Sequence, residues 1–155
     1  MPVPSFIVEL RKHVGTAPLW LSGATAVILD GRRVLLVRRA DSGDWSPVSG
    51  IIEPGEEPGV SARREALEEA GVHVRVDSLA EVNVTDTYTY PNGDIAQYLN
   101  FTFRCTYLSG DAAVGDDESL EVAWFDLDDL PDLRADYRAR IAIAIAGDVK
   151  TRFVR

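Results

Sequence analysis

The sequence contains one cysteine, no long apolar run and few basic residues, and each shortage excludes a class of protein. Cys105 has no second cysteine with which to form an internal disulfide, so a disulfide-stapled scaffold is excluded. No stretch reaches the roughly 18 consecutive apolar residues of a membrane-spanning helix. The first residues also lack a basic segment followed by a long apolar one. We therefore expect a cytoplasmic protein that has no membrane partner.

The shortage of basic residues bears on the partner. The chain has 16 Lys and Arg against 25 Asp and Glu, a formal net charge of −9. Nucleic acids are captured by basic surfaces, so we expect no nucleic-acid partner. The 155 residues, 46% of them hydrophobic, suffice for one domain with a buried core, and we assign residues 1–155 to a single domain.

The negative charge is concentrated in two segments. Residues 50–72 contain six Glu and two Arg, and residues 111–132 contain nine acidic residues and no Lys or Arg. Two such segments that met in space would repel each other unless a cation lay between them. Two solvated acidic loops are the alternative that charge alone leaves open.

Local patterns predict an α/β/α sandwich around a mixed β-sheet. A helix is expected from residue 5 to about residue 13, and another from Pro58 to Ala70, because Pro suits a first helical turn and Gly71 suits the position after the last. A terminal helix is expected over 133–146, ended by Gly147. Strands are expected at 24–29, 34–37, 72–76, 81–90, 95–107 and 121–126.

The helix predicted over 58–70 carries three carboxylates on one face. At 100° per residue, Glu65, Glu68 and Glu69 share an arc opposite an arc that we expect to be buried. The members of that second arc are Val60, Arg63, Ala66, Leu67 and Ala70. Like charges at this spacing repel, and a divalent cation such as Mg²⁺, which prefers oxygen ligands, would remove the conflict. An ordinary solvated helix face is the alternative for an isolated Glu-x-x-Glu-Glu pattern.

Residues 50–72 as a whole resemble the Nudix box of the MutT-like Nudix hydrolases. The matching positions are Gly50, Glu56, Arg64, Glu65, Glu68, Glu69, Gly71 and an aliphatic Val72, with five residues between Gly50 and Glu56 and seven between Glu56 and Arg64. Two positions depart from the usual pattern: Ala66 replaces a larger aliphatic residue, and Ser49 stands where a Gly is common. The strands expected at 24–29 and 34–37 form a hairpin through the turn Asp30-Gly31-Arg32. This hairpin and the segment around Trp124 are also similar to the family, so the resemblance covers most of the chain.

The resemblance implies a Nudix-type fold and a pyrophosphohydrolase activity. Water would attack phosphorus in a diphosphate linkage of a small nucleotide, with Mg²⁺ or Mn²⁺ bridging the phosphates and the acidic site. ADP-ribose-like compounds, other nucleoside diphosphate derivatives, nucleoside triphosphates and dinucleoside polyphosphates are the candidate substrates. A nucleotide-sensing Nudix domain without catalytic activity is the alternative.

The resemblance also assigns roles to the carboxylates. Glu65 and Glu69 become the expected metal ligands, with Glu68 as a third ligand, a water-mediated ligand or a catalytic group. Arg64 is expected to orient Glu56 in the catalytic machinery. The candidate general bases are Glu118, which is preferred, and the weaker candidates Glu53 and Glu121.

Substrate contacts are expected from a smaller set of residues. Arg38 and Arg39 end a strand beside the box and would hold a phosphate, with ordinary surface charge as the alternative. Gly50 permits close approach of the backbone, and Tyr88 would stack on a base unless it only packs within the sheet. The apolar circumference of the terminal helix would also suit a homodimer, unless the helix docks on its own sheet.

Overall fold

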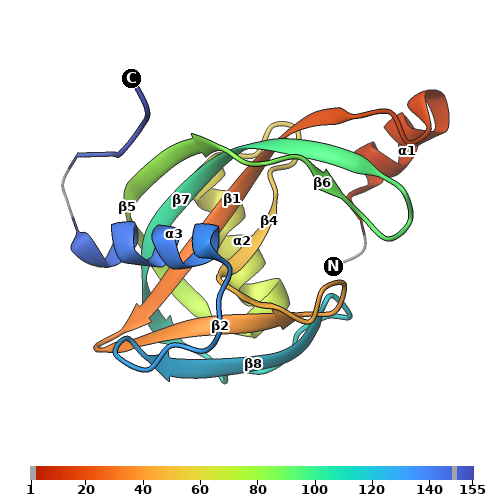
Figure 1. Ribbon diagram of the computed structural model, residues 1–155. Helices are drawn as coiled ribbons and strands as arrows, with labels where there is room; N and C mark the ends of the chain where they lie inside the picture. Colours follow the sequence, from red (N-terminus) through yellow and green to blue (C-terminus); the bar gives the residue numbers. More distant parts are fainter. Residues whose placement is uncertain (1–2, 148–149) are drawn as a thin grey trace.

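The computed structural model describes residues 3–147 and 150–155 (Figure 1). Within these residues eight strands form one mixed sheet, accompanied by three helices. The elements in chain order are α1 (Ser5–Val14), β1 (Leu19–Asp30), β2 (Arg33–Arg39), β3 (Trp45–Ser46), β4 (Val48–Ile51), α2 (Pro58–Ala70), β5 (His73–Val84), β6 (Tyr88–Thr89), β7 (Ile95–Ser109), β8 (Ser119–Asp126) and α3 (Ala135–Ala146). No helix in this part of the chain is long and apolar enough to cross a membrane.

The sheet is mixed because its two longest central strands run in the same direction. Its main order is β3-β2-β1-β7-β5, where β1 and β7 are parallel and the other neighbours are antiparallel. Three further strands branch from this path: β4 pairs with β1, β6 with β7, and β8 with β2. The pairing of β4 places Gly50 opposite Ala24 at the middle of the sheet.

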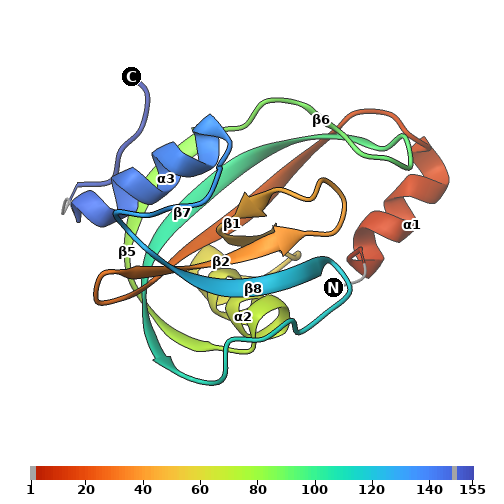
Figure 2. The same ribbon diagram turned by 60° about the horizontal axis from the view of Figure 1, so that its bottom comes forward.

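Helices α2 and α3 cover opposite faces of the sheet, as Figure 2 shows. Alternate residues of the central strands divide between two apolar clusters, because successive side chains of a strand point to opposite faces. Ala26 and Ile28 pack with the alanines of α2, whereas Val27 and Leu29 pack with Ile141 of α3. The predicted α/β/α sandwich is therefore confirmed.

Helix boundaries follow the sequence closely. Helix α2 spans Pro58–Ala70 as predicted, with Pro58 in its first turn and Gly71 after its end. Gly71 has a φ of 69°, and the backbone N–H groups of Gly71 and Val72 donate to the last turn. A left-handed conformation of this kind costs glycine little, which explains why the helix ends there. Helix α3 begins two residues later than predicted and ends at Ala146, before Gly147.

The strand predictions were less accurate. The two strands expected at 72–76 and 81–90 are one long strand, β5, followed by the short β6. Register shifts between β5 and β7 interrupt the alternation of side chains, which hides the continuity of β5 from a period-two pattern. Strands β3 and β4 lie in a segment where no strand was expected, and both are too short to show a period.

Helix α3 docks on the sheet of its own chain. Tyr137, Ile141 and Ala144 are buried, and Ile143 and Ile145 pack against the same cluster. The apolar circumference that suggested a homodimer is therefore largely covered within one molecule. On the far side, Arg11 holds α1 to the start of β7, where its guanidinium lies 2.9 Å from the Ile95 carbonyl oxygen and 3.4 Å from the Asp94 carboxylate.

Candidate active site

Helix α2 turns two carboxylates toward the sheet. Glu65 and Glu69 are 1% and 4% exposed, and the other buried residues of the helix are Ser61, Ala62, Ala66 and Ala70. The predicted buried arc is therefore wrong in part, because Val60 and Leu67 are half exposed. Small alanine side chains let the helix approach the sheet closely, and the two glutamates fill the remaining space on this face.

Burial shifts the titration of both carboxylates. It raises the pKa of Glu65 to about 7, although the neighbouring Arg64 acts in the opposite direction. It raises the pKa of Glu69 to about 8, and the charge of Glu65 adds to this rise. Oε2 of Glu69 is buried and has no hydrogen-bond partner among the described residues. Such a group is costly to ionise, unless a cation binds to it.

Gly50 leaves room for the Glu65 carboxylate. A Cβ atom at position 50 would lie 2.0 Å from Oε1 of Glu65 and 2.1 Å from its Cδ. Any side chain at position 50 would therefore displace the carboxylate. The structure thus gives Gly50 a contact with a candidate metal ligand, whereas the sequence suggested a contact with substrate.

Arg64 connects the glycine-rich loop to the acidic helix. Its guanidinium donates to both carboxylate oxygens of Glu56, at 2.8 and 2.9 Å, which lowers the pKa of Glu56. The same group donates to Glu65 at 2.7 Å and to Glu68 at 3.1 Å. The expected contact between Arg64 and Glu56 is present, and Arg64 also holds two of the predicted metal ligands.

The two acidic segments of the sequence meet at the end of α2. The backbone N–H groups of Ala113 and Gly115 donate to the carbonyl oxygens of Ala70 and Glu69, at 3.2 and 3.0 Å. This contact brings the acidic loop beside the helix, so the charge of Glu118 raises the pKa of both Glu65 and Glu69. Glu118 itself has a raised pKa, chiefly because the surrounding protein removes water from its carboxyl group.

Arg39 supplies positive charge at the edge of this acidic group. Its guanidinium forms a two-point contact with Asp41, at 2.9 and 2.7 Å. Burial raises the pKa values of Glu69, Glu118 and Tyr137, and the charge of Arg39 opposes this rise at all three groups. Arg39 therefore lies between the carboxylates and the aromatic residues near α3.

Some predicted site residues lie apart from the buried carboxylates. Arg38 donates to the Gly43 carbonyl oxygen at 3.1 Å and lies 3.6 Å from Glu121, so these two residues engage each other at the surface. Glu53 is exposed, and its backbone N–H donates to Glu56 at 3.1 Å. Tyr88 belongs to a cluster at α3.

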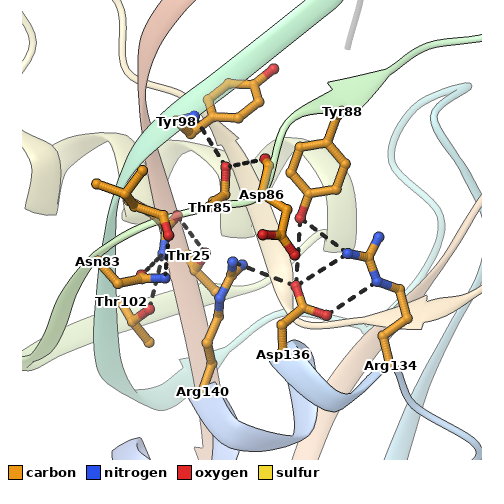
Figure 3. A network of polar contacts seen from close by, with 12 residues as sticks. Thr25, Asn83, Thr85, Asp86, Tyr88, Tyr98, Thr102, Arg134, Asp136 and Arg140 are labelled. Atoms are coloured by element: carbon orange, nitrogen blue, oxygen red, sulfur yellow. Dashed lines mark hydrogen bonds and ion pairs between the residues drawn. The ribbon is translucent and has the colours of Figure 1, made fainter.

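This cluster is a second polar group that the sequence did not predict. Arg134, Asp136 and Arg140 meet Tyr88 at the start of α3, as Figure 3 shows. In the sequence the three charged residues resemble the exposed side of a helix end, and their only distinguishing mark is that Arg140 falls on the same side as the buried Tyr137 and Ile141.

The carboxylate oxygens of α2 are the ligand type that a hard divalent cation prefers, although they are not arranged around one point. No group of three His, Cys, Asp or Glu residues in the described ranges is placed so that it could hold a metal ion. Arg64 donates hydrogen bonds to Glu65 and Glu68, and these contacts hold the two carboxylates toward Arg64. The buried Oε2 of Glu69 has no partner among the described residues, so Glu69 would gain most from a bound cation.

Comparisons with known proteins agree with the fold and the box. A curated relative, a nucleoside triphosphate pyrophosphatase/Nudix hydrolase fusion protein of Bifidobacterium longum, is 29% identical over 133 residues. The match covers 78% of this chain and 26% of the relative, so the chain spans about a quarter of the length of the curated relative it matches.

Two solved structures share the fold. An ADP-ribose pyrophosphatase from Streptococcus suis matches with a TM-score of 0.69 and 23% identity, over 86% of this chain and 98% of that chain. A UDP-X diphosphatase matches with a TM-score of 0.68 and 23% identity, over 92% of this chain and 70% of that chain. The family model of the NUDIX domain matches residues 20–144, from the start of β1 to the last turns of α3. The chain therefore belongs to the Nudix family.

Proposed function

We propose that this chain is a metal-dependent Nudix pyrophosphohydrolase. It hydrolyses the diphosphate linkage of a small nucleoside diphosphate derivative, ADP-ribose-like in form, or of a nucleoside triphosphate. Membership of the Nudix family supports the reaction class. The names of the two structural neighbours, an ADP-ribose pyrophosphatase and a UDP-X diphosphatase, favour nucleoside diphosphate derivatives.

The observation that carries the proposal is the buried pair Glu65 and Glu69. Two carboxylates one helical turn apart are almost fully removed from water, and one oxygen of Glu69 has no partner in the described part of the chain. A helix that only needed a solvated acidic face would turn these side chains outward. Their burial at a net cost in stability is typical of a site that holds a cation.

We assign separate roles in metal binding and positioning to the acidic residues and to Arg64. Glu65 and Glu69 would hold Mg²⁺ or Mn²⁺, with Glu68 as a further ligand, and the cation would neutralise the diphosphate and polarise its phosphorus. Arg64 orients Glu56, Glu65 and Glu68 through its hydrogen bonds.

Glu118 is proposed as the general base. Its charge is among the main influences on the pKa values of Glu65 and Glu69, whereas that of Glu53 is not, and Glu121 lies beside Arg38. The carboxylate of Glu118 accepts a proton from the attacking water as the new P–O bond forms. The bond between the bridging oxygen and the attacked phosphorus then breaks, which releases a nucleoside monophosphate and a second phosphate product. Arg39 is placed to bind the phosphates, since its charge acts on the same carboxylates.

Two accompanying proposals concern location and assembly. We place the protein in the cytoplasm, because its one cysteine is a buried residue whose pKa burial raises to about 12, so it supports neither a disulfide nor thiolate chemistry. The homodimer expected from the sequence stays a proposal, although α3 buries most of its apolar side chains on the sheet of its own chain, and light scattering is its test.

The proposal is tested by incubating the protein with ADP-ribose, nucleoside triphosphates and dinucleoside polyphosphates, with Mg²⁺, Mn²⁺ or excess EDTA. We expect a nucleoside monophosphate as product, no turnover in EDTA, and one ¹⁸O atom from labelled water on the attacked phosphorus. Full activity in EDTA would refute the metal role. Release of orthophosphate from monoesters alone would refute the reaction class, and metal-dependent nucleotide binding without turnover would favour the sensing alternative.

A further inference from the structure

Arg134, at the N-cap of α3, is held rigidly although its side chain is partly exposed. Its Nε donates to Asp136 Oδ1 at 3.1 Å, and its Nη2 donates to the hydroxyl oxygen of Tyr88 at 3.3 Å. The guanidinium carbon also lies 5.2 Å from the ring centre of Tyr88 and 4.8 Å from that of Tyr137. Two aromatic rings and a carboxylate therefore fix its orientation.

A second arginine supports this arrangement from inside the protein. Arg140 is 5% exposed, and within the described residues its ion pair is a single contact of 3.6 Å between Nη2 and Asp136 Oδ2. Its Nε is buried and has no hydrogen-bond partner among the described residues. Figure 3 shows the guanidinium groups of Arg134 and Arg140 on either side of the Asp136 carboxylate. A buried arginine with so few partners is costly for a purely structural contact.

One edge of Arg134 remains open to a ligand. The contacts above use Nε and Nη2, and Nη1 makes no hydrogen bond within the described residues. The side chain of Arg134 is 38% exposed and that of Asp136 is 36% exposed, so a solute can reach this edge. The two arginines and Tyr88 already contact the oxygens of Asp136, so Nη1 of Arg134 is the group at this edge without a partner among the described residues.

The cluster also adjoins the proposed diphosphate site. Leu133 forms a β-bridge with Trp45, whose strand pairs with the end of β2 at Arg38. The next residue, Arg39, acts electrostatically on Glu69 and on Tyr137, the tyrosine beneath Arg134. A substrate with its phosphates at Arg39 would extend one end toward Arg134.

We infer that Arg134 is a specificity-determining residue, which donates from Nη1 to a hydrogen-bond acceptor on the part of the substrate remote from the cleaved bond. Asp136, Arg140 and Tyr88 are positioning residues that hold it in place. The inference rests on the proposed function for its link to catalysis. The acceptor belongs either to the nucleobase, as a ring nitrogen or a carbonyl oxygen, or to the terminal sugar, as a hydroxyl oxygen, and an arginine can donate to each of these.

Loss of one charge-assisted hydrogen bond predicts a fall of about 10- to 100-fold in kcat/KM for substrates that carry the acceptor. The fall should appear mainly in KM, because Arg134 is remote from the reacting atoms. Preorganisation strengthens the effect, since no side-chain freedom remains to be lost on binding.

The kinetic experiment compares Arg134→Ala and Arg134→Lys with the wild type on two substrate series. ADP-glucose, UDP-glucose and GDP-glucose differ in the base, whereas ADP-glucose and ADP-ribose differ in the terminal sugar. Arg138→Ala is the control, because Arg138 is exposed on the same helix and donates only to the Pro131 carbonyl oxygen. We expect altered ratios between substrates in both Arg134 variants and unaltered ratios in the control.

A change in ratio confined to the base series identifies a base acceptor, and one confined to the sugar series identifies a sugar acceptor. Equal loss on every substrate, or no loss, would overturn the inference. Arg134→Lys keeps the charge and the stem but lacks the planar fork, so it remains informative if Arg134→Ala does not fold.

A binding experiment separates this inference from the proposed function. In EDTA, AMP, GMP and UMP are titrated into ¹⁵N-labelled protein while the arginine Nε–H resonances are followed. Shifts of the Arg134 and Arg140 signals that saturate, and a weaker affinity in Arg134→Lys, are expected even if no diphosphate is ever cleaved. If neither these nucleotides nor ADP-ribose and UDP-glucose moves these signals, the assignment of Arg134 fails, whatever the outcome of the turnover assays.

Discussion

Replacement of Glu69 by glutamine separates a metal site from an ordinary acidic helix. Glutamine has nearly the same shape and a similar helix propensity, so the change removes the ability of the side chain to ionise and alters little else. Glu69 is 4% exposed, burial raises its pKa to about 8, and its Oε2 lacks a partner within the described residues. The wild-type protein therefore holds a group that is costly to ionise in the folded state when no metal is bound.

The size of this cost follows from the two pKa values. Between the ordinary value of 4.5 and about 8, the folded protein retains a proton that the unfolded chain has lost. The contribution of Glu69 to stability is therefore most favourable below pH 4.5 and falls as the pH rises through this window, by about 1.4 kcal/mol per pH unit. At pH 7 the accumulated loss is about 3 kcal/mol. Glutamine does not titrate, so Glu69→Gln should be more stable than the wild type by up to this amount at pH 7 and equally stable near pH 4.

The assay is urea unfolding in EDTA at several pH values, combined with turnover in Mg²⁺ or Mn²⁺. We expect Glu69→Gln to gain stability in the metal-free state and to lose turnover by two orders of magnitude or more, because a charged ligand is gone. Glu57→Gln is the control, since Glu57 is exposed in the same acidic segment and should change neither property much. Equal turnover in the two variants, or a stability difference that does not depend on pH, would refute the reasoning.

Three further predictions follow from the same geometry. Gly50→Ala should lower turnover by about 100-fold, measured as kcat, because its Cβ would lie 2.0 Å from Oε1 of Glu65 and displace a ligand; unchanged kcat would contradict this placement. Mn²⁺ affinity, measured by calorimetry, should rise between about pH 6 and pH 8 as protons leave Glu65 and Glu69; a flat profile would exclude these ligands. For the homodimer, light scattering should give twice 17.0 kDa, and a monomer at micromolar concentration would refute it.

The sequence predicted those parts of the fold that depend on local chemistry. Pro58 and Gly71 determine where α2 begins and ends, and the Asp30-Gly31-Arg32 turn sets the hairpin of β1 and β2. It did not predict features that arise from pairing with distant strands. The continuity of β5 depends on shifts in register against β7, which no local window contains.

The orientation of α2 escaped prediction for a related reason. A helical wheel assigns the buried side to apolar residues, and it therefore favoured Val60 and Leu67. In the structure these two residues are half exposed, whereas Glu65 and Glu69 face the protein interior. The rule fails here because the helix places ionisable groups where packing alone would select apolar ones. The Nudix box drew attention to these carboxylates as metal ligands, and neither it nor the wheel indicated their burial.

The distribution of cations ranks the carboxylates as metal ligands. Arg64 donates to Glu56, Glu65 and Glu68, so each of these has a positive partner before any metal binds. Among the main influences on the pKa of Glu69 in the described structure, Arg39 is the one cation, and Asp41 already holds it. Glu69 is therefore the least compensated member of the group. If a divalent cation binds here as proposed, it would gain most at Glu69, and its binding to Glu65 and Glu68 would compete with their hydrogen bonds to Arg64.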